Sequence, residues 1–210
     1  MADKDIYYRA YMTIKAVIFD LDGTITRPYF DFDSIRQQIG LDREAGPLLE
    51  LMDKMDPEQY RMAETILNYH EQKAVTDSRL NPGARRTLRK LREAGIRIGI
   101  LTRNRRTNAI AIEKKHGLKF DAIVGREDGP VKPDAFGVLH LCRLFGVEPR
   151  QSMVVGDYLF DLQCAKAGGA LAVLLNNDGK GQQFAEHADF CIENISQILQ
   201  IIEQNRQRTD

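Results

Sequence analysis

The segment AVIFDLDGTIT (16–26) decides the interpretation of the whole chain. It overlaps an apolar run, IKAVIF (14–19), that predicts a buried strand ending at Asp20. Side chains alternate along an extended chain, so Asp20 and Asp22 point in the same direction, and Gly23 permits a sharp bend after them. Two carboxylates this close together are costly unless a cation or a proton keeps them compatible. An ordinary acidic turn would account for one aspartate and the glycine, but not for the signals that follow later strands.

Polar side chains with complementary chemistry follow three later apolar segments. They are Thr102 in ILTRN (100–104), Lys132 in GPVKPDAF (129–136), and Asp157 with Asp161 in VVGDYLFD (154–161). Each lies just past a predicted strand, and the carboxyl ends of parallel strands share one edge of a sheet. With Asp20 and Asp22 they supply carboxylates, a hydroxyl and an ammonium. Phosphoryl transfer through a carboxylate needs this set, because it requires metal ligands, donors for the phosphoryl oxygens and an acid/base.

Apolar runs bounded by turn signals alternate with helical patterns along the chain. The predicted strands are 14–19, 97–101, 121–125, 152–156, 171–175 and 189–192, and the predicted helices are 82–94, 104–117, 133–145, 159–167 and 194–206. Pro82 and Pro133 suit a first helical turn. Strands that alternate with helices imply right-handed crossovers and a mainly parallel sheet. The expected fold class is therefore α/β, with a Rossmann-like parallel sheet core and helices on both faces.

One stretch after the first strand breaks this alternation, because it has helical but no strand character. Its predicted amphipathic helices run from Phe32 to Ile39, from Pro47 to Met55 and from Pro57 to Ala74. An insert that leaves from the end of the first strand would cover the edge at which ligands of such sheets bind. We therefore expect an α/β core of residues 1–26 and 79–210 and a small helical cap of residues 27–78.

Composition and charge exclude several classes of function. Of the 210 residues, 43% are hydrophobic and 29% charged, and 30 Lys and Arg balance 30 Asp and Glu, so no net field favours nucleic acid or an anionic membrane. Cys142, Cys164 and Cys191 form neither a metal-type pair nor a disulfide framework. Residues 1–15 lack the apolar core of a signal peptide, and no segment approaches the ~20 apolar residues that span a bilayer. These observations predict a cytoplasmic enzyme with reduced thiols.

The four polar segments, in this order and spacing, resemble the motifs of the haloacid dehalogenase superfamily of phosphotransferases, over about residues 14–192. The passage LNPGARRTLRKLREAGIRIGILTRN (80–104) looks like the one by which phosphoglycolate-phosphatase-like members return from a cap to the core. Members with an insert after the first motif usually carry a helical cap. The resemblance thus implies a phosphatase that acts on a small phosphorylated metabolite and uses Mg²⁺ as its cofactor.

The resemblance assigns a role to each motif aspartate. Asp20 would attack phosphorus and become a phospho-aspartate, and Asp22 would protonate the leaving oxygen and later take a proton from water. The Asp20 carboxylate, the backbone carbonyl of Asp22 and Asp157 would hold Mg²⁺, a hard cation that takes oxygen ligands. Asp161 would bind the metal either directly or through water.

The remaining motif residues would bind the phosphate. Thr102 and the backbone N–H of Arg103 would hold phosphoryl oxygens, and Lys132 would neutralise charge on the nucleophile and the phosphate. The ionised aspartates outnumber this one lysine, so a dianionic phosphate would enter only together with a divalent cation.

Residues outside the motifs carry weaker interpretations. His70 lies on the apolar stripe of the long insert helix and is expected to pack against the other insert helices rather than contact substrate. Arg27, Tyr29 and Phe30 directly follow the first motif, where substrate contact and loop packing both remain open.

Four alternatives share part of this pattern. A carbon–halogen hydrolase of the superfamily would lack an acid at Asp22, and a phosphate-pumping ATPase would have threonine there and need transmembrane segments. A phosphomutase shares every core motif and differs only in what its cap excludes, so it stays open. A catalytically silent binding or regulatory protein on the same fold also stays open, although no nucleophile or acid is missing. Neither the particular phosphomonoester nor the oligomeric state follows from the sequence.

Overall fold

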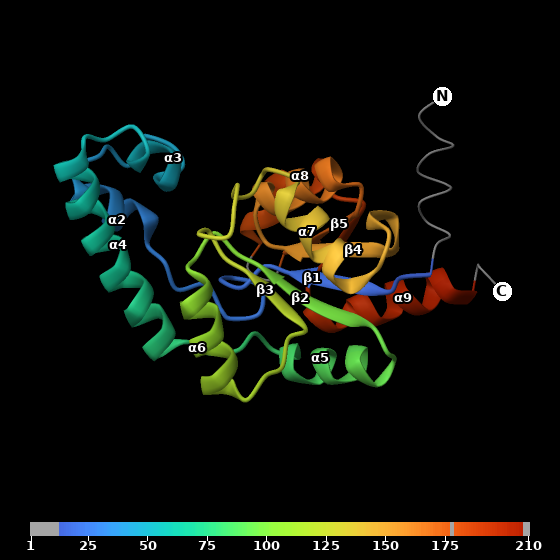
Figure 1. The fold of residues 1–210 in the computed structure, drawn as a ribbon. Coiled ribbons are helices and arrows are strands. Elements are labelled where there is room, and N and C mark those ends of the chain that lie inside the picture. The colour runs from blue at the N-terminus through green and yellow to red at the C-terminus, as the bar shows by residue number, and fades with distance from the viewer. Residues whose placement is uncertain (1–12, 177–178, 208–210) are drawn as a thin grey trace, which may run out of the picture. The chain divides into compact units, whose positions relative to one another are not determined.

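Figure 1 shows the fold in a computed structural model that describes residues 13–176 and 179–207. The chain forms two compact units, of which one is Pro28–Ser78 and the other is the chain before and after it. The first twelve residues, most of the stretch searched for a signal peptide, lie outside the described part. Within the described part, no helix is long and apolar enough to cross a membrane.

In the larger unit, six described strands form one parallel sheet in the order β3-β2-β1-β4-β5-β6. They are β1 (Ala16–Phe19), β2 (Arg97–Leu101), β3 (Ala122–Val124), β4 (Ser152–Gly156), β5 (Leu171–Leu175) and β6 (Phe190–Ile192). Every predicted strand is confirmed, and β2, β4 and β5 have the predicted bounds. The direction in which strands are added reverses between β1 and β4, which are neighbours. In sheets of this kind such a reversal marks where ligands bind, at the carboxyl ends of the strands.

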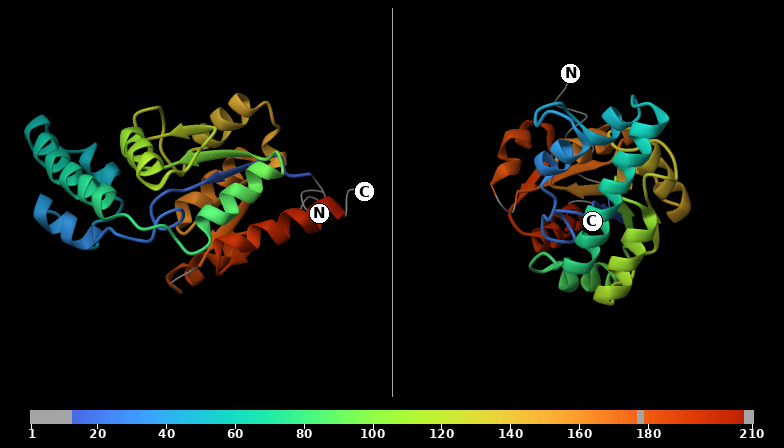
Figure 2. Two further views of the ribbon diagram at one scale, coloured as in Figure 1. Left: turned by 90° about the horizontal axis from the view of Figure 1, so that it is seen from below. Right: turned by 90° about the vertical axis from the view of Figure 1, so that its left-hand side faces the viewer.

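Helices cover both faces of this sheet, as Figures 1 and 2 show. They are α5 (Ala84–Glu93), α6 (Arg106–His116), α7 (Phe136–Phe145), α8 (Leu159–Gly168) and α9 (Ile198–Gln207), with 3₁₀ turns at Pro149–Gln151, Lys180–His187 and Ile195–Gln197. Helices α7 and α8 lie on one face, and α5 and α9 lie on the other. Leu141 and Leu162 of the first pair belong to one buried core cluster with Ile18 and Val154 of the central strands. Burial on both faces explains why the strands read as continuous apolar runs.

The two prolines predicted for first helical turns lie instead before their helices. Helix α7 begins at Phe136, with Ala135 as its N-cap, so Pro133 lies before the helix; the backbone N of Phe136 donates to Asp134 Oδ1 at 2.7 Å. Pro82 likewise precedes Gly83, which is the N-cap of α5. The prediction was therefore wrong by two residues for Pro82 and by three for Pro133.

The smaller unit contains three helices in its described residues. They are α2 (Phe32–Ile39), α3 (Leu48–Met52) and α4 (Pro57–Asp77). These helices enclose an apolar cluster of their own, formed by Ile35, Leu48, Met52, Ala63 and Leu67. Helix α4 begins at a capping box in which Asp56 and Gln59 satisfy each other's backbone N–H groups. A separate core of this kind makes the insert a compact unit in its own right.

Three residues outside the motifs, for which substrate contact and packing were both considered, form contacts inside this smaller unit. His70 Nε2 lies 3.0 Å from Gln38 Oε1 and so joins α4 to α2, as the packing interpretation expects. The hydroxyl of Tyr29 donates to Asp77 Oδ2 at 2.8 Å, and Phe30 packs against the apolar cluster. These contacts give Tyr29 and Phe30 a structural role within the insert.

The chain leaves the larger unit and returns to it through adjacent residues. The backbone N of Arg27 donates to the carbonyl oxygen of Arg79 at 2.8 Å. Two residues later, Asn81 Nδ2 donates to three carbonyl oxygens of the turn 23–26, at 2.8, 2.8 and 3.1 Å. Asn81 is buried, so the returning chain fixes the turn that follows Asp20.

Candidate active site

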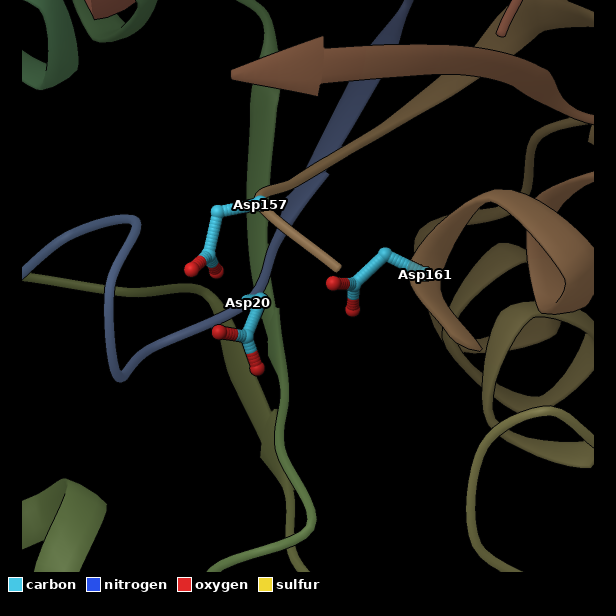
Figure 3. A group of neighbouring side chains, drawn as sticks. All are labelled: Asp20, Asp157 and Asp161. Carbon is cyan, nitrogen blue, oxygen red and sulfur yellow. The ribbon is translucent and has the colours of Figure 1, made fainter. Parts of the chain in front are cut away.

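Three aspartates meet at the carboxyl edge of the sheet, where β1 and β4 end. Asp20 directly follows β1, Asp157 directly follows β4, and Asp161 lies in the first turn of α8. Figure 3 shows the carboxylate of Asp161 facing Asp20, while those of Asp20 and Asp157 project from the strand ends in the same direction. One carboxylate oxygen from each lies within 4.8 Å of the other two. The predicted convergence of these three side chains is therefore present.

Two glycines make this close approach possible. Gly23 has a φ of 92°, and a Cβ added there would lie 2.2 Å from Asp157 Oδ2. A Cβ added to Gly156 would lie 2.1 Å from the carboxyl carbon of Asp161. Any other residue at either position would have to displace a carboxylate of the cluster.

Lys132 brings an ammonium into the acidic cluster from the loop between β3 and α7. Its Nζ donates to Asp20 Oδ1 at 2.5 Å and to Asp161 Oδ1 at 2.6 Å. The lysine side chain is 4% exposed, so both charge-assisted bonds are shielded from solvent. The lysine thus fixes one carboxylate oxygen of Asp20 and one of Asp161.

Two neighbouring side chains hold this lysine and Asp161 in place. Arg103 Nη1 donates to the carbonyl oxygen of Lys132, and its guanidinium lies over the ring of Phe160, 4.7 Å from the centroid. Asp161 Oδ2 accepts from the backbone N of Tyr158 at 3.1 Å. Both oxygens of Asp161 therefore already receive a hydrogen bond, and the Arg103 side chain joins the loop that carries Lys132 to the first turn of α8.

The cluster carries more negative charge than its lysine compensates. Burial raises the pKa of Asp20 well above its ordinary value, and the attraction of Lys132 only partly opposes this. Burial and the charge of Asp161 raise the pKa of Asp157 to about 7, although Thr24 Oγ1 donates to its Oδ1 at 3.1 Å. Burial lowers the pKa of Lys132, but the carboxylates of Asp161 and Asp20 outweigh it and leave that pKa above its ordinary range.

This charge excess and this donor set fit a divalent cation. The three converging side chains offer only carboxylate oxygens, which are the ligands that Mg²⁺ prefers. A cation between them would offset the cost that burial places on their ionised forms. Mg²⁺, the cofactor expected from the sequence, is thus compatible with the residues present.

A second group of side chains places Asp22 beside Thr102. Asn104 Nδ2 donates to Asp22 Oδ2 at 3.0 Å, and its backbone N donates to Thr102 Oγ1 at 3.0 Å. Burial raises the pKa of Asp22, and the bond from Asn104 opposes that rise. Sequence reasoning left the Asn104 side chain unassigned and missed Thr24 and Asn81. Only Asn104 had a usable signal, because it lies two residues past Thr102 at a strand end.

An open parallel sheet with acidic side chains and a lysine at its carboxyl edge defines a ligand-binding enzyme of the doubly wound α/β class. Residues 26–174 match the model of a family described as haloacid dehalogenase-like hydrolase. The chain belongs to the haloacid dehalogenase-like hydrolases. The matched residues begin just after Asp20 and Asp22, so the match itself assigns no role to these two aspartates.

Comparison with individual proteins shows which members of this family the chain is similar to. The chain is 31% identical to an uncharacterized hydrolase of Saccharomyces cerevisiae, and the match covers 90% of this chain and 91% of the relative. It is 29% identical to a phosphoglycolate phosphatase of Nitrosospira multiformis, over 76% of this chain and 82% of the relative. A solved structure of β-phosphoglucomutase from Clostridium difficile superimposes with a TM-score of 0.73 at 22% identity. The superposition covers 92% of this chain and 98% of the β-phosphoglucomutase chain. The predicted superfamily, its phosphoglycolate-phosphatase-like subgroup and the α/β fold are confirmed.

Proposed function

We propose that the protein is a Mg²⁺-dependent phosphatase that hydrolyses a small phosphomonoester through a phospho-aspartate on Asp20. The observation that carries the proposal is the bond from Lys132 Nζ to Asp20 Oδ1, made within a cluster that also contains Asp157 and Asp161. A carboxylate held by one oxygen at a strand end has a fixed direction, which suits attack on phosphorus.

In the first step, an oxygen of Asp20 forms a bond to phosphorus while the ester oxygen leaves. Asp22 gives its proton to that leaving oxygen, a role for which the raised pKa of the buried carboxyl is suited. Thr102 and the backbone N–H of Arg103 hold the phosphoryl oxygens as charge moves onto them. Lys132 balances charge on the phosphate as well as on Asp20.

In the second step, water attacks phosphorus and the bond to Asp20 breaks. Asp22, now ionised, takes the proton from this water, so one residue serves as acid and then as base. The products are inorganic phosphate and an unmodified Asp20 carboxylate.

Asp20, the backbone carbonyl of Asp22 and Asp157 would hold Mg²⁺. The ion, when bound, supplies positive charge that lets a dianionic phosphate enter beside the aspartates. Asp161 differs from the other two aspartates, because Lys132 and the Tyr158 backbone already donate to both of its oxygens. We therefore assign it to positioning the lysine and to binding the metal through water.

The relatives and the insert together support the proposed substrate class. The name of the Nitrosospira multiformis relative makes phosphoglycolate the first substrate to assay. We propose that the helical unit Pro28–Ser78 acts as a cap that selects among small phosphomonoesters. The likeness to β-phosphoglucomutase concerns the fold, and it gives no separate support to mutase activity.

Phosphate release from 4-nitrophenyl phosphate and a panel of phosphorylated metabolites tests the proposal. Turnover should need Mg²⁺, disappear in excess chelator and return when Mg²⁺ is restored, with inorganic phosphate as the product. Acid-quenched protein should carry a hydroxylamine-labile phosphoryl group on Asp20. Phosphoryl transfer to a second sugar hydroxyl without phosphate release would indicate a mutase. Absence of any turnover or label with Mg²⁺ would indicate a silent binding protein.

A further inference from the structure

Asn104 is a buried amide whose hydrogen bonds run outward from the acid/base residue into α6. It is 6% exposed, and its Nδ2 donates to Asp22 Oδ2 at 3.0 Å. On the other side of the amide, Asn104 Oδ1 accepts from the backbone N of Arg105 at 2.7 Å and from Asn108 Nδ2 at 2.8 Å. Asn108, which is 2% exposed, lies one helical turn further along α6.

The two donors fix which way the Asn104 amide faces. A backbone N–H can only donate, so the atom beside Arg105 N has to be the oxygen of the amide. Asn108 adds a second donor to the same oxygen. Turning the amide over would set its NH₂ group against these donors and its oxygen against the Asp22 carboxylate. A buried polar group that faces the wrong partner is strongly disfavoured, so the amide is held in one orientation.

We propose that Asn104 and Asn108 are positioning residues that hold the Asp22 carboxylate in the direction its acid/base role requires. Asn104 binds Oδ2 of Asp22 and stops the carboxylate from rotating. In the described chain no hydrogen bond to Asp22 Oδ1 is present, so this oxygen is the one that exchanges the proton with the leaving group and with water. Asn108 acts on Asp22 through the Asn104 amide, whose oxygen it binds. This inference rests on the proposed function, because it assumes that Asp22 transfers a proton.

Two substitutions disturb this chain of bonds at different distances from Asp22. Asn104→Leu removes the donor to Asp22 while keeping a similar shape. Asn108→Asp replaces the NH₂ group that donates to Asn104 Oδ1 with a carboxylate oxygen. Because two oxygens would then face each other, the Asn104 amide should favour the opposite orientation. Asn205→Leu serves as the matched control, because Asn205 is also a buried amide but lies on α9, which packs against α5 and the turn Ile195–Gln197.

Rapid-quench measurement of Asp20 phosphorylation by two aryl phosphates tests the inference. 4-Nitrophenolate leaves without a proton, whereas phenolate from phenyl phosphate is a poorer leaving group that benefits from one. With Asn104→Leu and Asn108→Asp, phosphorylation by phenyl phosphate should slow by about tenfold or more. Phosphorylation by 4-nitrophenyl phosphate should stay within about threefold of wild type, and Asn205→Leu should change neither rate.

The outcomes separate this inference from the proposed function. If the wild-type protein forms no phospho-aspartate, the proposed function fails before any variant is compared. If it does, equal slowing with both substrates, or slowing with neither, overturns the positioning role. Should Asn104→Leu not fold, as judged by its thermal unfolding, Asn108→Asp carries the test by itself, and a ratio of the two rates equal to that of wild type contradicts the proposal.

Discussion

The two ends of the central sheet both pair aspartates with basic side chains, but the balance of charge differs. At the amino end, Asp121 precedes β3 and accepts from the backbone N of Ile98 at 2.8 Å. Arg92 and Arg97 approach the same carboxylate to 3.3 and 3.7 Å, and their side chains are 38% and 58% exposed. At the carboxyl end, three described aspartates converge, and the buried ammonium of Lys132 pairs with two of them, Asp20 and Asp161.

This difference separates a structural ion pair from a site that needs a ligand. One carboxylate facing two solvated cations needs no further positive charge, and such surface pairs contribute little to stability. Three carboxylates with one lysine are unbalanced, and burial makes that imbalance costly. Binding a cation would therefore relieve electrostatic repulsion at the carboxyl end but not at the amino end.

The largest contrast should appear in activity. Asp20→Asn keeps the shape of the side chain but removes the attacking charge, so kcat should fall by ~10³-fold or more, about 4 kcal/mol of transition-state stabilisation. Asp121→Asn, at the other end, should leave kcat within about twofold of wild type. Steady-state turnover of 4-nitrophenyl phosphate measures both, and comparable losses would remove the distinction between the two ends.

Stability without metal gives the next contrast. Lys132→Met leaves two buried carboxylates without their partner and should lower the free energy of unfolding by about 3 kcal/mol. Arg97→Met should lower it by less than about 1 kcal/mol, because its pair is exposed. Urea unfolding in chelator measures both values. Millimolar Mg²⁺ should restore part of the loss in the lysine variant only, and a lysine variant as stable as wild type would argue against the charge imbalance.

The pH dependence of stability sharpens the comparison further. The pKa of Asp157 rises from 3.8 to about 7 on folding, so between these values the folded protein binds more protons than the unfolded chain. The free energy of unfolding of the metal-free protein should therefore fall as pH rises from 4 to 7, by on the order of 3 kcal/mol from this group. Urea unfolding at several pH values measures this effect: the contribution of Asp157 is the difference in the free energy of unfolding between wild type and Asp157→Asn. Saturating Mg²⁺ should reduce that difference. A difference that grows in the opposite direction would contradict the raised pKa.

The smallest effect should come from the amino end. Asp121→Asn retains an oxygen that can accept from Ile98 N and loses only the charge facing Arg92 and Arg97. The free energy of unfolding should change by less than about 1 kcal/mol, and the change should shrink in high salt. Urea unfolding at low and high ionic strength measures it, and a loss above 2 kcal/mol would mean that this pair is structurally essential.

The sheet and the meeting of Asp20, Lys132, Asp157 and Asp161 were predictable from the sequence. Strands buried on both faces are continuous apolar runs, and parallel strands bring whatever follows them to one edge. The catalytic roles and the domain boundaries at 26 and 79 stay predictions, because neither geometry nor likeness to relatives measures them.

Other features could not be predicted, because they depend on contacts between side chains or across long stretches of sequence. The orientation of the Asn104 amide depends in part on Asn108, which lies outside the segment ILTRN (100–104). The contact of Asn81 with the turn 23–26 joins residues that the whole insert separates in the sequence. Helix α7 begins at Phe136 rather than at Pro133, so the preference of proline for a first turn did not decide where it starts.

The hydrogen bond between Arg27 and Arg79 has a consequence for how such an enzyme can change over time. Because the ends of the inserted helices are already side by side, a different segment with close ends could replace them without moving any strand. Recombination at this point would exchange the proposed cap and leave the proposed reacting residues in register. One ancestral core could in this way acquire many specificities, each through a single genetic event at the same two positions.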